Sequence, residues 1–122
     1  METPKIFDSE YKFCLLLWDV EPINSTQLAA LCKERLGWSK ATTYTVIRRL
    51  SQRGIVKNEN ATVSSLVSKQ EVQRSRIQKM VDETFEGSMP AFLAAFSGGK
   101  RLTRQEVDQL QVMIDRYQEE EP

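Results

Sequence analysis

Histidine is absent from this chain of 122 residues, and cysteine occurs only twice. Imidazole nitrogens and cysteine thiolates are the usual ligands of zinc, and Cys14 and Cys32 lie far apart in the sequence. We therefore expect no metal site and no cofactor. Histidine is also the most frequent general base near neutral pH, and the five glycines form no phosphate-binding loop. These absences argue against an enzyme.

The two cysteines lie among apolar residues at helical spacing, as small hydrophobic residues of a core do. Burial keeps most thiols inert. We therefore expect two reduced core cysteines. A regulatory disulfide or a thiol sensor is the alternative interpretation.

The sequence also lacks a long hydrophobic run. Its longest apolar cluster, residues 13–18, is far shorter than the roughly 20 residues that cross a bilayer. The first ten residues do not have the charged and apolar regions of a signal peptide. We expect no membrane span and a cytoplasmic location. With 40% apolar residues, the chain is nonetheless expected to fold.

The formal net charge is zero, but the charges are distributed unevenly. Residues 1–67 carry nine basic and seven acidic side chains, whereas residues 68–122 carry eight and ten. Residues 33–57 alone hold seven basic side chains against one acid, Glu34. Local charge governs attraction to phosphates, so this segment is a candidate nucleic-acid surface. A solvated charged face is the alternative interpretation.

The segment from Gly37 to Gly54 predicts a helix with two different faces. Ser39 is expected to cap its beginning, and Gly54 to end it. A short polar helix with small hydroxyls and arginines is typical of helices that enter the major groove of DNA. Its apolar stripe is Val46, Ile47 and Leu50, and its outward side chains are Thr42, Tyr44, Thr45, Arg48 and Gln52, with Lys40, Arg49 and Arg53 adding positive charge.

Two further helices are expected before this one. The first is capped by Asp8 or Ser9, runs to about Trp18, and is apolar enough to be buried on more than one side. The second begins after Asn24, an N-cap residue, and runs to about Leu36. The apolar residues of the second helix that we expect to face inward are Leu28, Leu31, Cys32 and Leu36.

Two β-prone runs, residues 55–57 and 62–67, flank the turn-rich residues 58–60 and predict a β-hairpin. Three helices followed by a hairpin is the order of a winged helix-turn-helix, in which the hairpin is the wing. We therefore predict a mainly α fold, with a DNA-binding domain in residues 1–67.

Residues 68–122 are predicted to form a helical dimerisation domain. Capping boxes open two of its helices, at Ser68 and Thr103, and a flexible joint is expected at Gly98-Gly99. About 55 residues with few large apolar groups make a poor core alone, so their stripes are expected to pack against a second copy. Packing back on the N-terminal domain is the alternative. The predicted dimerisation residues are Ile77, Val81, Phe85, Phe92, Phe96, Val107, Leu110, Ile114 and Tyr117.

Several motifs carry a resemblance to a known family. Leu17-Trp18 ends the first predicted helix, Trp38-Ser39-x-x-Thr42 precedes the third, and Arg49-Leu50 through Arg53-Gly54 closes it. LVSKQE at residues 66–71 and Phe92-Leu93-x-x-Phe96 follow. In these motifs, and over almost its whole length, the chain resembles the penicillinase and methicillin-resistance repressors and the copper-responsive repressor, the BlaI/MecI/CopY family.

The resemblance implies a homodimeric transcriptional repressor that binds inverted-repeat operators in double-stranded DNA. Threonine and arginine suit base edges, and Ser39 with the adjoining helix N-terminus suits a phosphate. Trp38 is interpreted as a packing residue. The candidate DNA-binding residues are Ser39, Lys40, Ala41, Thr42, Tyr44, Thr45, Arg48, Arg49 and Lys57.

Three features depart from the family pattern. The wing is shorter, and its one basic residue is Lys57. Members controlled by a sensor protease are cut at an Asn-Phe bond, where this chain has Ala95-Phe96. The copper-responsive members carry a cysteine hook near the C-terminus, which this sequence lacks. The last two departures argue against induction by cleavage at that bond and against copper sensing through that hook, and an unidentified inducer or sensor protease is a candidate partner. A winged helix that binds protein rather than DNA is the alternative function.

Overall fold

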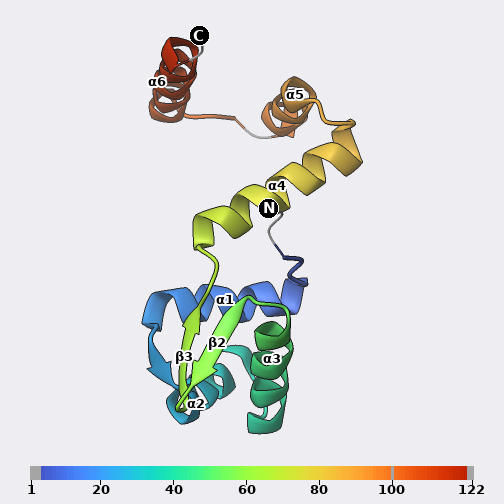
Figure 1. Ribbon diagram of the computed structural model, residues 1–122. Coiled ribbons are helices and arrows are strands. Elements are labelled where there is room, and N and C mark those ends of the chain that lie inside the picture. The colour runs from blue at the N-terminus through green and yellow to red at the C-terminus, as the bar shows by residue number, and fades with distance from the viewer. Residues whose placement is uncertain (1–3, 100, 121–122) are drawn as a thin grey trace. The chain divides into compact units, whose positions relative to one another are not determined.

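The computed structural model describes residues 4–99 and 101–120, and within these ranges it contains six helices and a three-stranded sheet (Figure 1). The predicted mainly α fold is confirmed. The chain divides into two compact units, residues 1–77 and 78–122. The predicted domain boundary after residue 67 falls between the last strand and the following helix, and it stays a prediction. The elements are α1 (Asp8–Val20), β1 (Ile23–Asn24), α2 (Ser25–Leu36), α3 (Lys40–Gln52), β2 (Val56–Glu59), β3 (Thr62–Ser65), α4 (Lys69–Phe85), α5 (Met89–Gly99) and α6 (Arg104–Glu120).

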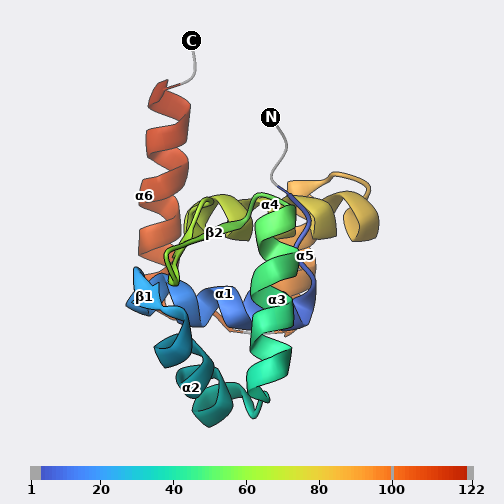
Figure 2. The same cartoon turned by 60° about the horizontal axis from the view of Figure 1, so that its bottom comes forward.

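The sheet of the first unit has the antiparallel order β1-β3-β2 (Figures 1 and 2). The predicted hairpin is present as β2 and β3. Strand β1 was not predicted. It is formed by two residues between α1 and α2, and it exists because Ile23 and Asn24 pair with Val63 and Thr62 of β3. The sheet therefore joins the hairpin to the beginning of α2.

The hairpin turn holds two residues in the left-handed region, Asn60 at φ 52° and Ala61 at φ 60°. Such a two-residue loop suits asparagine and glycine, whereas the Cβ of alanine is strained there. We expect Ala61→Gly to raise the free energy of unfolding by about 0.5–1 kcal/mol, measured by urea denaturation. Ala30, exposed within α2, provides the control, because Ala30→Gly should lower the stability by about 1 kcal/mol. A destabilised Ala61→Gly variant would contradict this account of the turn.

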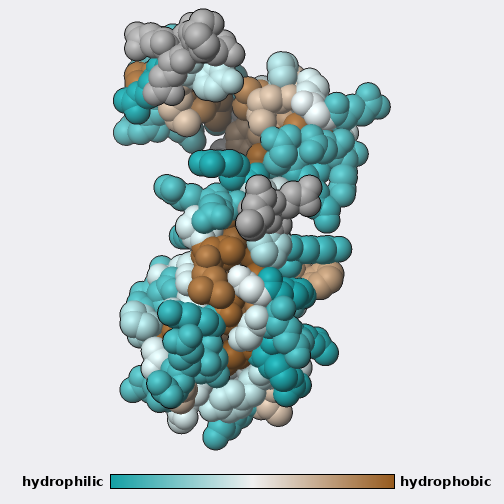
Figure 3. All heavy atoms as spheres, in the orientation of Figure 1, coloured by the Kyte–Doolittle hydropathy of each residue, from teal (hydrophilic) through white to brown (hydrophobic). Residues whose placement is uncertain are grey.

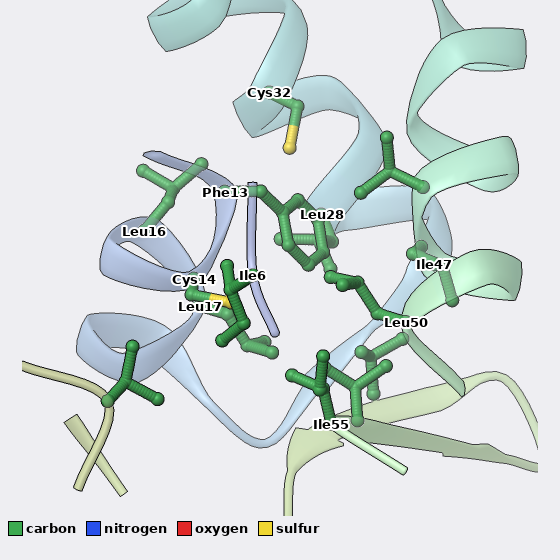
Figure 4. Packing of buried hydrophobic residues seen from close by; sticks show 14 residues of the cluster. Ile6, Phe13, Cys14, Leu16, Leu17, Leu28, Cys32, Ile47, Leu50 and Ile55 are labelled. Atoms are coloured by element: carbon green, nitrogen blue, oxygen red, sulfur yellow. The ribbon is translucent and has the colours of Figure 1, made fainter. Parts of the chain in front are cut away.

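The core of the first unit forms where α1, α2, α3 and the sheet meet (Figure 4). The expected burial of α1 on more than one side is confirmed, since Phe13, Cys14, Leu16 and Leu17 are all buried. Trp38 stacks on Phe13 with the ring centroids 6.1 Å apart. The predicted apolar stripe of α3 is confirmed as buried, and so are Leu28 and Cys32 of α2, whereas Leu31 and Leu36 are partly buried.

Most of the predicted helix caps are confirmed. Asn24 Oδ1 accepts a hydrogen bond from the Thr26 backbone, and Ser39 Oγ accepts one from the Thr42 backbone. The capping boxes that begin at Ser68 and Thr103 are also present. The cap of α1 was predicted wrongly. The N-cap residue is Phe7 rather than Asp8 or Ser9, because Glu10 reaches back to accept a hydrogen bond from the Phe7 backbone.

In the second unit, the end of α4 is followed by α5 and α6. Val81 is completely buried, and Phe92 packs against Phe85 with the ring centroids 5.9 Å apart. Gly87 turns the chain between α4 and α5 at φ 83°. The prediction of a flexible joint at Gly98-Gly99 is wrong, because both glycines lie in the last turn of α5.

Candidate nucleic-acid interface

Helix α3 is anchored along one side and exposed along the other. Its buried side comprises Thr43, Val46, Ile47 and Leu50, which lie at helical spacing and pack into the core. Thr43 carries a polar hydroxyl and was not among the residues expected to be buried. It is buried because it lies on the same side of the helix as the apolar stripe. Tertiary packing thus fixes which side of α3 faces the solvent.

The exposed side of α3 carries a continuous polar stripe. Ala41, Thr45, Arg48 and Gln52 follow one another at intervals of four, three and four residues, and each of them except the partly buried Thr45 is exposed. Thr42 and Arg49 flank this stripe on one edge, and Lys40 and Tyr44 flank it on the other. The structure therefore brings these predicted site residues together on one surface of α3.

Ser39 and Thr42 form a hydrogen-bonded pair at the beginning of α3. Their hydroxyl oxygens are 2.9 Å apart, and the Thr42 backbone donates to Ser39 Oγ at 3.1 Å. Only one of the two hydroxyl protons is used between them, so the other remains to be donated outward. Because the side chains are exposed and lie at a helix N-terminus, this pair has the chemistry to bind a phosphate oxygen.

Tyr44 is turned toward the beginning of α2 rather than straight out of α3. Its ring packs against the core cluster, and the Thr26 and Ser25 hydroxyls lower the pKa of its phenol. Lys40 Nζ lies 5.8 Å from the centre of the Tyr44 ring, within cation–π range. The phenol and the ammonium group therefore lie on the α2 edge of the exposed surface, where they can meet a backbone phosphate.

Arg53 is not part of the exposed basic surface, although its charge was counted there in the sequence. Its guanidinium pairs with Glu10, which is buried at the beginning of α1. It also lies 5.4 Å from the centre of the Phe7 ring. Forty-three residues separate Glu10 from Arg53, so no local sequence pattern could have revealed the pair.

The wing contributes little positive charge. Lys57 is exposed on β2, and Glu59 at the end of the same strand is also exposed. The turn of the wing is attached to the beginning of α2, since the Ser25 backbone donates to the Ala61 carbonyl oxygen at 2.8 Å. The hairpin therefore lies against its own domain, and Lys57 is its one candidate phosphate contact.

The sequence model of the penicillinase repressor family matches residues 6–116. The chain belongs to the penicillinase repressor family. The resemblance seen in the sequence motifs is thereby confirmed, and this family comprises winged-helix, DNA-binding transcriptional repressors rather than enzymes.

Two solved structures of the repressor BlaI show the same winged-helix fold. The monomeric form of BlaI from Bacillus licheniformis, in complex with the blaP half-operator, is 21% identical, with 58% of this chain and 93% of that chain covered and a TM-score of 0.51. The DNA-binding domain of the repressor BlaI is 22% identical, with the same coverage and a TM-score of 0.50. Reduced MarR from E. coli is 16% identical over 93% of this chain and 75% of that chain, with a TM-score of 0.46. A search of the curated proteins gives no significant match.

The predicted dimerisation residues of this family member differ in their exposure. Val81 is buried within the chain, and Phe85 and Phe92 are partly buried. Met113, which was not predicted, is 65% exposed and widens the α6 stripe, because it lies three residues after Leu110. The large apolar side chains exposed among the remaining predicted positions are Ile77, Phe96, Val107, Leu110, Ile114 and Tyr117.

Figure 3 shows where hydrophobic residues reach the surface. In the first unit they gather near the end of β3, where Leu66 is 53% exposed. None of the helices in the described ranges is both long and apolar enough to cross a membrane.

The two cysteines have the environment of core residues. Cys14 and Cys32 are buried, with 2% and no exposure respectively. Loss of hydration raises the pKa of Cys14 to about 12, with Glu10 adding to the effect, and it also raises the pKa of Cys32. At pH 8 only roughly one Cys14 thiol in ten thousand is ionised, compared with roughly one in ten for a free cysteine of pKa 9.0.

We therefore expect neither cysteine of the native protein to react with iodoacetamide at pH 8 within an hour, whereas both react in 6 M guanidinium chloride. Mass spectrometry measures the modification, because each adduct adds a fixed mass. Rapid labelling of Cys14 or Cys32 in the folded state would contradict the core interpretation and favour the thiol sensor.

Proposed function

We propose that this penicillinase repressor family member is a homodimeric transcriptional repressor, acting in the cytoplasm, that binds inverted-repeat operator DNA through α3. The observation that carries the proposal is the two-sided character of α3. Its apolar side is buried in the core, and its side with hydroxyls and guanidinium groups is open to solvent. A helix presented in this way can enter the major groove, which admits one α-helix.

The charge around α3 supports this proposal. Of the seven basic residues between 33 and 57, Arg53 pairs with Glu10 and the other six are exposed, whereas the same segment has one exposed acid, Glu34. Attraction to DNA phosphates depends on such local charge rather than on the net charge of the chain. The six exposed basic residues are Lys33, Arg35, Lys40, Arg48, Arg49 and Lys57.

Within this proposal the residues of α3 have separate roles. Arg48 lies on the central stripe and reads a base, since arginine can donate two hydrogen bonds to guanine. Thr45, Ala41 and Thr42 contact base edges or thymine methyl groups. Ser39, Lys40, Tyr44, Arg49 and Lys57 are proposed to bind the phosphates on either side of the groove.

The apolar side of α6 supports a dimer. Leu110, Met113, Ile114 and Tyr117 are exposed at helical spacing along one side of a helix whose remaining residues, apart from Val107 and Val112, are polar or charged. A second copy is the natural occupant, because a two-fold dimer places two α3 helices on two half-sites of an inverted repeat. BlaI has been solved on a half-operator as a monomer, which is consistent with one winged helix on each half-site.

The competing function, a winged helix that binds protein, has one observation in its favour, the short wing attached to α2. Salt dependence separates the two functions. If about six phosphates are contacted, the logarithm of the DNA association constant should fall with the logarithm of salt concentration with a slope of about −5. Fluorescence anisotropy with labelled duplexes measures this slope, and a slope near zero would favour the protein-binding function.

A further inference from the structure

The carboxylate of Glu10 is buried at the beginning of α1, and its two partners come from different parts of the fold. The side chain of Glu10 is 7% exposed. Its Oε1 atom accepts a hydrogen bond from the Phe7 backbone at 2.9 Å and also pairs with Nη2 of Arg53. A buried carboxylate is costly unless it is paired and hydrogen-bonded, so these two partners hold it in one geometry.

Arg53 lies at the C-terminal end of α3, which Figure 1 shows beside the N-terminal end of α1. Its backbone closes the helix by donating to the Arg49 carbonyl oxygen at 3.2 Å. Its guanidinium is held between Glu10 and the ring of Phe7. Arg53 therefore uses its charge within the domain, and it connects the last turn of α3 to the first turn of α1.

We propose that Glu10 and Arg53 form a positioning pair that sets the orientation of α3, so that Arg48 meets its base in the major groove. This inference rests on the proposed function. Groups that recognise a ligand have to be held within about 0.5 Å of their productive positions by surrounding contacts. Arg48 and Arg53 are five residues apart on one helix end, so a change in the tilt of that end displaces Arg48.

Positioning and simple electrostatics predict opposite results for the variant Glu10→Gln. This substitution removes a negative charge and releases the Arg53 guanidinium, so electrostatics alone would strengthen binding to every DNA sequence. Positioning instead weakens binding to the operator, while binding to random DNA stays the same or becomes tighter. The amide oxygen of glutamine can still accept the hydrogen bond from the Phe7 backbone, so the cap of α1 is retained.

The test uses the full chain and two duplexes, an operator selected from random DNA and a scrambled duplex of equal length. The measured quantity is the ratio of the two affinities. We expect Glu10→Gln and Arg53→Gln each to lower this ratio roughly five- to ten-fold, and the double variant to lower it no further, because both changes break one interaction. Arg53→Lys, which can still pair with Glu10, should restore most of the ratio.

Asp8→Asn is the matched control. It removes an acid from the same turn of α1, but Asp8 is 93% exposed and pairs with Arg76 of α4 instead of with α3. The ratio should therefore be unchanged. Thermal unfolding is measured for every variant, and binding is compared at a temperature at which each is folded. If Glu10→Gln does not fold, the positioning pair is tested by the affinity ratios of Arg53→Gln and Arg53→Lys. The ratio should fall in Arg53→Gln and stay near the wild-type value in Arg53→Lys.

Two results would overturn the positioning pair while leaving the proposed function intact. The first is an unchanged ratio in Glu10→Gln. The second is a loss of affinity in Arg53→Gln that is equal on both duplexes and is accompanied by a salt slope smaller by about 0.9. That result would make Arg53 a phosphate contact. A wild-type protein that shows no preference between the two duplexes would instead overturn the proposed function, and the inference with it.

Discussion

The variant Arg48→Ala is expected to bind operator DNA about 1–3 kcal/mol more weakly than the wild type, while its affinity for random DNA falls much less. Arg48 is exposed on the central stripe of α3, with Thr45 one turn before it and Gln52 one turn after it. From that position its guanidinium can reach the edge of a guanine. Anisotropy titrations on both duplexes measure the two affinities, and circular dichroism confirms that α3 is retained.

Two control variants separate the reading of a base from the contact with a phosphate. Arg48→Lys keeps the positive charge but loses the planar guanidinium that binds guanine through two hydrogen bonds. It should therefore keep the salt slope of the wild type and lose the preference for operator DNA over random DNA. Arg49→Ala, at the edge of the stripe, should weaken binding about equally on every sequence. An equal loss on both duplexes for Arg48→Ala would make Arg48 a phosphate contact and would contradict its role in reading a base.

The second large effect concerns α6. Ile114 is 50% exposed in the single chain and lies at the centre of the apolar stripe. Ile114→Asp would place a carboxylate from each copy in the proposed interface, at a cost of about 3 kcal/mol or more for each uncompensated buried charge. We expect the dimer to dissociate at micromolar concentration and operator affinity to fall with it. Sedimentation velocity measures the assembly state.

Val112 provides the matched control for this variant. It lies on the same helix and is 57% exposed. Because it is two residues from Ile114, it points to the opposite side of α6. Val112→Asp adds the same charge to the same helix and should leave the dimer intact. Dimers that survive Ile114→Asp, or that dissociate in Val112→Asp, would show that the apolar stripe of Leu110, Met113, Ile114 and Tyr117 is not the interface.

Sequence patterns were sufficient to predict the elements whose determinants are local. The helix α3 was predicted with its cap at Ser39, its buried stripe and its exposed side, because a 3.6-residue period and a capping residue are both visible within the segment. The capping boxes at Ser68 and Thr103 were equally visible. The hairpin was indicated by its turn residues.

Features that depend on distant partners could not be predicted in this way. The pair of Glu10 and Arg53 joins two helices, so a charge that looked available for DNA is used inside the domain. Strand β1 is too short to have a period, and it is defined only by its partner β3. The cap of α1 was missed for a different reason: its acceptor, Glu10, is local, but phenylalanine is not a preferred N-cap residue, so Phe7 did not stand out in the sequence. Gly98 and Gly99 remained helical although glycine is a poor helix former.

The most direct test of the account is the selection of bound sequences from random duplexes by the purified full chain. Two copies of α3 related by two-fold symmetry should enrich an inverted repeat, with half-site centres about 10 base pairs apart or at a multiple of that spacing. Arg48→Ala should lose the preference at one symmetric pair of positions within that repeat. Enrichment of no sequence, or of a single site without symmetry, would contradict the claim that α3 reads operator half-sites as part of a dimer.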